Sequence, residues 1–153
     1  MNAKDKQRLQ YDLIKYCDQI GIYPEERPKL VFYKNEMIRI FRNSQYEGKV
    51  LFSDVDNCIG ECFHDLRTIF IYSRGRHLNI EKMTYSHWLF ILIHELVHYR
   101  FEDMRHDRVK DAEFLKRVRE IMIDDKHFES VHIKAGCSHS SDVWRCWDCF
   151  LLQ

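Results

Sequence analysis

Proline and glycine are scarce in this sequence, with two and five residues respectively among 153. That scarcity argues against a collagen-like or other fibrous chain and against a disordered chain. Apolar residues make up 45% and aromatic residues 14%, a composition typical of an ordered chain with a packed core. The length is that of one domain with room for a small appendage. We therefore expect a globular domain.

Excess charge and long apolar runs are also missing. Lys+Arg and Asp+Glu number 24 each, so no net charge favours binding to nucleic acid or to an anionic membrane. The longest apolar stretch, residues 88–93, is far shorter than a membrane span. The N-terminal segment MNAKDKQRLQYDLIKYC is too polar for a signal peptide. These absences predict an intracellular protein with no membrane partner.

Apolar periodicity predicts the order of the elements. Residues 3–20 carry apolar side chains at helical spacing and precede Gly21, which predicts an amphipathic helix. Four β-prone runs follow and predict a small twisted sheet: residues 30–33, 37–42, 49–52 and 67–72. The apolar run over residues 84–101 is too long for a strand and predicts a largely buried helix. A further helix is predicted to begin at Asp107, which is a good N-cap residue.

Residues 94–98, inside the buried helix, read HELVH. His94 and His98 lie four positions apart, so on a helix both imidazoles project from one face and can bind one ion. Glu95 is offset by about 100° from His94, which places a carboxylate beside that ion without making it a ligand. This pattern is typical of zinc peptidases, in which zinc acidifies a water and a glutamate takes its proton. The other interpretation is a core helix whose two histidines are hydrogen-bonded inside.

A catalytic zinc usually has three protein ligands and one open position, so a third ligand is expected after His98. His106 is the first candidate, since a chain reversal between Glu102 and Arg105 would bring it back under the metal. Glu113 on the following helix is its main rival, and Asp111 is a weaker one. The sequence leaves this choice open.

The C-terminal tail carries a second set of metal-ligating residues. Cys137, His139, Cys146 and Cys149 are able to form a closed tetrahedral zinc site, with His132 as an alternative to His139. In a reducing compartment such cysteines are metal ligands or free thiols rather than disulfides. Two other interpretations are a terminal strand with incidental thiols, and a tail thiolate that binds the catalytic zinc and keeps an enzyme latent.

The motif and its surroundings resemble a known family. HELVHYRF, followed by RHDRVKDAEFLKRVREI, resembles the SprT-like group of zincin metallopeptidases. Upstream, IGECFHDLRTIFIYS resembles that group's segment in which a Gly-x-Cys pair leads into a strand, and these stretches cover residues 59–123. The tail segment VWRCWDC at 143–149 resembles the second half of the zinc module at the end of SprT proteins. The compact gluzincin-like peptidases of archaea are the neighbouring family.

The resemblance implies a zinc-dependent endopeptidase in which His94, His98 and a third histidine bind zinc and Glu95 is the base. In the gluzincin-like alternative, Glu113 would be the third ligand. The group's enzymes act on proteins trapped on DNA, so the resemblance implies a protein or peptide substrate, and DNA as a partner rests on this resemblance alone. The resemblance thus implies one catalytic zinc, and the tail adds a possible structural one.

Together these patterns predict an α+β, zincin-like fold. A metallopeptidase domain is expected over residues 1–125 and a small Cys/His tail over residues 126–153, because a polar stretch separates them. The substrate is expected to add as a strand at a sheet edge, at residues 68–72. The alternatives are a non-catalytic, zinc-stabilised protein that binds DNA or a protein partner, and a latent peptidase inhibited by its own tail.

Overall fold

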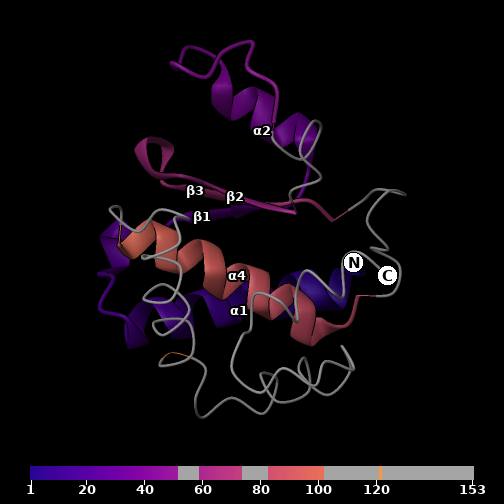
Figure 1. Cartoon of the computed structure of the whole chain (residues 1–153), viewed down its shortest axis with the longest axis vertical. Coiled ribbons are helices and arrows are strands. Elements are labelled where there is room, and N and C mark those ends of the chain that lie inside the picture. Colours follow the sequence, from indigo (N-terminus) through magenta and orange to yellow (C-terminus); the bar gives the residue numbers. More distant parts are fainter. Residues whose placement is uncertain (52–58, 74–82, 102–120, 122–153) are drawn as a thin grey trace, which may run out of the picture.

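The structure is a computed structural model that describes residues 1–51, 59–73, 83–101 and 121. In chain order, the described elements are α1 (Ala3–Gln19), η1 (Pro24–Glu26), β1 (Lys29–Val31), α2 (Lys34–Phe41), β2 (Gly60–Phe63), η2 (His64–Leu66), β3 (Thr68–Ile71) and α4 (Tyr85–Arg100). The sheet lies between α2 on one side and α4 with α1 on the other (Figure 1). The described residues therefore form a mixed α+β arrangement of three helices and a three-stranded sheet, which confirms the predicted class in its coarse form.

The sheet has β3 at its centre. β3 pairs in parallel with β1, with Leu30 opposite Ile69, and antiparallel with β2, with Gly60 opposite Ile71. The predicted strand over 67–72 is thus confirmed, and the one over 30–33 is confirmed in part. The expectation that residues 68–72 offer an open edge is wrong, because β3 has a partner strand on both sides. Among the described strands, β1 and β2 are the edges.

The predicted strand over residues 37–42 is wrong, because this segment lies in the helix α2. Its apolar side chains do not follow the strict alternation of a strand. Met37 and Phe41 are one helical turn apart, so both side chains are buried on the face of α2 that meets the sheet. Phe41 meets Phe63 of β2 edge to face, with ring centroids 5.1 Å apart. The predicted strand over 49–52 is also wrong where it is described, since residues 49–51 form no strand.

The helix α1 confirms the predicted amphipathic helix. The side chain of Asn2 accepts a hydrogen bond from the backbone N–H of Asp5 at 2.8 Å, which caps a helix end that would otherwise leave its N–H groups without partners. The buried residues lie on one face and are Leu9, Leu13, Tyr16 and Cys17. The chain leaves the helix through Gly21, whose φ of +78° favours glycine.

The helix α4 confirms the predicted buried helix over residues 84–101. Thr84 caps its start and forms a reciprocal capping box with His87, whose Nδ1 lies 3.0 Å from the Thr84 backbone nitrogen. Most of its side chains are buried between the sheet and α1. The helix predicted from Asp107 lies outside the described residues. No helix in the described ranges is long and apolar enough to cross a membrane.

Candidate metal centre

The two histidines of HELVH lie one turn apart on α4, and their rings converge. His94 Nε2 and His98 Nε2 are 3.2 Å apart, and the ring centroids are 4.9 Å apart. Two nitrogen ligands of one tetrahedral zinc, each about 2.0–2.1 Å from the ion, lie roughly 3.3–3.4 Å from each other. A hydrogen bond between two neutral rings would produce a similar distance. The pair therefore has the spacing of two zinc ligands, and both side chains are half-buried rather than enclosed.

Glu95 lies on the neighbouring face of α4, against β2. Its side chain is 6% exposed, and its carboxylate lies beside the backbone of Gly60. Burial, followed by the charge of Glu61, raises the pKa of Glu95 from its ordinary 4.5 to about 8. Such a carboxyl holds a proton at neutral pH until a nearby positive charge, such as a metal ion, favours its ionised form.

Two residues of β2, Gly60 and Glu61, shape the surroundings of Glu95. The sequence motifs include Gly60 in a Gly-x-Cys pair but predict no contact of either residue with Glu95. Gly60 supplies the backbone that the carboxylate approaches, and Glu61 is a second buried carboxyl, 6% exposed. Glu61 stands opposite Phe70 in the antiparallel ladder, so its side chain shares the α2 face of the sheet with Phe70. The available sequence signal was the glycine itself, because glycine within a strand marks a close approach of another group.

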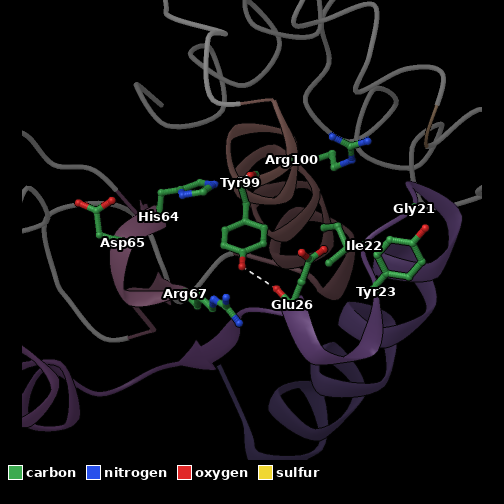
Figure 2. Close-up of a pocket in the computed structure, with 9 residues that line it drawn as sticks. All are labelled: Gly21, Ile22, Tyr23, Glu26, His64, Asp65, Arg67, Tyr99 and Arg100. Atoms are coloured by element: carbon green, nitrogen blue, oxygen red, sulfur yellow. Dashed lines mark hydrogen bonds between the residues drawn. The ribbon is translucent and has the colours of Figure 1, made fainter.

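The last turn of α4 is held by contacts to η1 and η2. His64 Nε2 lies 3.0 Å from the carbonyl oxygen of Tyr99, and the two rings stack with centroids 5.0 Å apart. With its proton on Nε2, His64 donates a hydrogen bond to the Tyr99 carbonyl. This carbonyl lies in the last turn of α4, where the helix itself supplies no N–H donor. The Tyr99 hydroxyl donates to the carbonyl oxygen of Glu26 at 2.6 Å, as the dashed line in Figure 2 shows.

These contacts border a cavity of about 520 Å³ at the C-terminal end of α4 (Figure 2). Its lining includes Ile22, Tyr23, Arg67 and Arg100, together with His64, Tyr99 and Glu26. Arg67 donates to the carbonyl of Glu25 at 3.0 Å, which ties η1 to the turn before β3. The contacts fix the end of α4.

The donor set on α4 fits zinc in kind, since two imidazoles beside a carboxylate that is not a ligand are typical of catalytic zinc sites. Within the described residues, no group of three or more His, Cys, Asp or Glu side chains is arranged to hold a metal. The predicted third ligands, His106, Asp111 and Glu113, lie outside the described residues, as do Cys137, His139, Cys146 and Cys149 of the tail. The structure thus places His94 and His98 together, while the third ligand and the second zinc stay predictions.

Comparison with known proteins gives no further support: no family model matches the chain, and no match is found among curated proteins or among solved structures. The resemblance to SprT-like peptidases therefore rests on the sequence motifs alone. The geometry of α4 and β2 is the independent observation on which a function can be argued.

Proposed function

We propose that this protein is a zinc-dependent endopeptidase whose active-site helix is α4. The observation that carries the proposal is the convergence of His94 Nε2 and His98 Nε2 to 3.2 Å, with Glu95 buried on the next face of the same helix. Packing alone does not account for a buried carboxyl beside two converging, half-buried imidazoles, since a carboxyl is costly to bury. Catalytic zinc sites of the HExxH type use this combination.

In the proposed reaction, His94 and His98 would hold the metal through their Nε2 atoms, together with a third ligand from the chain after α4. Zinc in such a site polarises the peptide carbonyl and makes the attacking water acidic. Glu95 takes the proton from the water as it attacks the carbonyl carbon and then delivers it to the leaving amine nitrogen.

The proposed substrate is an extended polypeptide bound along the edge strand β2. Gly60 of this strand lies against Glu95, so a peptide paired with β2 would pass beside the base. An unfolded or flexible protein segment can adopt this extended conformation, whereas a folded domain cannot. On the resemblance to SprT-like enzymes alone, we include proteins associated with DNA among the substrates. Single-stranded DNA added to a cleavage assay tests whether the substrates include such proteins, and we expect it to increase the cleavage rate.

The proposal is tested by cleavage of an unfolded protein substrate by the zinc-loaded full chain. We expect wild type to cleave it, a chelator to abolish cleavage, and added zinc to restore it. Glu95→Gln keeps the side-chain shape but removes the base, so cleavage should fall about 10²–10⁴-fold while bound zinc is retained. Tyr11→Phe is the matched control, because Tyr11 is 68% exposed on α1, and it should cleave like wild type.

If wild type binds zinc through α4 and cleaves no unfolded protein, the non-catalytic binding protein is the better interpretation. If Glu95→Gln cleaves as fast as wild type, Glu95 is no base and the proposed mechanism is wrong.

A further inference from the structure

We propose that Gly60 is a positioning residue for the general base, because its missing side chain leaves the space in which the Glu95 carboxylate lies. This inference rests on the proposed function, since it concerns how the base of that reaction is held. In addition to binding the substrate along its edge, β2 would then hold the general base in position through Gly60.

The space around the α-carbon of Gly60 is filled by side chains of α4. A β-carbon built there would lie 2.5 Å from Glu95 Oε1, 2.8 Å from Ile91 Cγ2 and 3.0 Å from Glu95 Cδ. The first two distances are shorter than real β-carbon contacts, so at least one group would have to move. Two of the three contacts are to the carboxyl group of the base.

Gly60 differs in this respect from two other glycines of the described chain. Gly21 and Gly48 have φ values of +78° and +75°, and a β-carbon at either position would meet no atom within 4 Å. These two glycines serve the backbone conformation of turns. Gly60 lies in a strand without a positive φ, so its backbone accepts other residues and only the contact with α4 requires glycine.

A side chain at residue 60 would displace Glu95 rather than the strand. Gly60 stands opposite Ile71 in the β2–β3 ladder, and the Tyr72 backbone N–H donates to the Ile59 carbonyl at 2.7 Å, so β2 is held on both sides of the glycine. The Glu95 carboxylate is the end of a flexible side chain, and moving it by about 1 Å would relieve the contact. A shift of that size in a catalytic group costs up to about 10²-fold in rate.

The test is Gly60→Ala in the full chain, with zinc content, kcat and KM measured on one preparation below the unfolding temperature of every variant. We expect zinc per chain and KM to stay at wild-type values and kcat per bound zinc to fall about 10- to 100-fold. A purely structural role would lower the unfolding temperature and the folded fraction but leave kcat per bound zinc unchanged.

A readout that does not depend on cleavage comes from cobalt(II) in place of zinc. We expect the pH dependence of the visible cobalt spectrum to shift in Gly60→Ala. The shift should have the same direction as in Glu95→Gln, because in both variants the base is no longer in place. Ile71→Val is the control for general damage to the packing around β2, since Ile71 stands opposite Gly60 in β3 and belongs to the apolar cluster that contains Ile91. It should keep the wild-type spectrum and kcat per bound zinc.

The added methyl group also meets Ile91, a branched side chain that moves little. Gly60→Ala is therefore expected to lose stability through this contact as well, for a reason unrelated to the base. The double variant Gly60→Ala/Ile91→Ala removes that second contact and keeps the one with Glu95. We expect it to fold and bind zinc, with kcat lower than in Ile91→Ala alone.

Two results overturn the inference. In the first, the double variant matches Ile91→Ala within about twofold in kcat per bound zinc, and its cobalt spectrum is that of wild type. The positioning role of Gly60 is then wrong although the proposed function stands. In the second, wild type itself neither binds zinc nor cleaves protein, and the proposed function fails together with the inference.

Discussion

The helices α1 and α4 pack against each other on the same side of the sheet, yet they differ in which residues they bury. α1 buries one stripe of four residues, and its other residues are half-buried or exposed. α4 is buried on nearly every side, and its buried residues include Ser86, His87 and Glu95. Apolar packing accounts for every buried position of α1. In α4, His87 and Thr84 form the helix cap, whereas the buried carboxyl of Glu95 has a cost that packing does not explain.

The first prediction concerns the helix that serves packing alone. Leu13→Ala should lower the free energy of unfolding by about 2–5 kcal/mol, because it removes most of a core side chain. Leu13 is only 5% exposed. Cleavage per bound zinc should stay at the wild-type value, because Leu13 belongs to the packing of α1. Denaturant unfolding measures the first effect. Ile14→Ala, at a neighbouring position that is 44% exposed, should change stability by less than about 1 kcal/mol.

The second prediction concerns the buried carboxyl of α4 in metal-free protein. The pKa of Glu95 is raised from 4.5 to about 8, so across this pH range the folded chain holds a proton that the unfolded chain has released. The stability that protonated Glu95 contributes is therefore fully present below pH 4.5, its pKa in the unfolded chain. It is lost as pH rises through about 8, its pKa in the folded chain. Glu95→Gln stays neutral at every pH, so it should be more stable than wild type by roughly 1–3 kcal/mol near pH 9.

That difference should shrink to nothing below about pH 4.5, where wild type is also neutral at this position. Thermal unfolding in chelator across the pH range measures it. A loss of stability in Glu95→Gln that grows as pH rises would show that Glu95 is ionised and paired in the metal-free fold, and the contrast between the two helices would disappear.

The third prediction concerns the polar contact that joins the two helices. The Tyr85 hydroxyl of α4 donates a hydrogen bond to Asp12 Oδ2 of α1, and the Arg8 guanidinium lies 3.9 Å from the centre of the Tyr85 ring. Burial and this hydrogen bond raise the pKa of Tyr85 above its ordinary value. Tyr85→Phe should cost about 1–2 kcal/mol, because Asp12 loses a donor while half-buried. Tyr11→Phe should have no measurable effect on stability.

The fourth and smallest effect is expected at the start of α1. Asn2→Ala removes the side-chain acceptor for the Asp5 N–H and should cost about 0.5–1 kcal/mol. Asn2→Asp keeps an acceptor at the same position and should be close to neutral. Equal losses in both variants would show that the cap does not contribute to the stability of α1.

The sequence predicts α1 and α4 well because both depend on local pattern and on caps. It fails for α2, since apolar residues at 37, 38, 40 and 41 suit a strand nearly as well as a helix. It misses β2, since the run GECF contains glycine and glutamate, which strands disfavour, and only pairing with β3 fixes it as a strand.

The candidate site divides in the same way. The spacing of His94 and His98 predicts their convergence, because it follows from the helical period alone. The approach of Glu95 to Gly60 joins residues that are 35 positions apart in the chain, and no local pattern predicts such a contact. The contribution of Glu61 to the raised pKa of Glu95 depends on the same long-range packing.

The most direct test of the central claim is the zinc content per chain of wild type, His98→Ala and His64→Ala. His64 is a matched control, since it contacts Tyr99 in the last turn of α4 but is not a proposed ligand. The account predicts that His98→Ala loses about one equivalent of zinc and that His64→Ala keeps the wild-type content. If His98→Ala retains both the zinc and the fold of wild type, α4 is a core helix and the proposed metal centre does not exist.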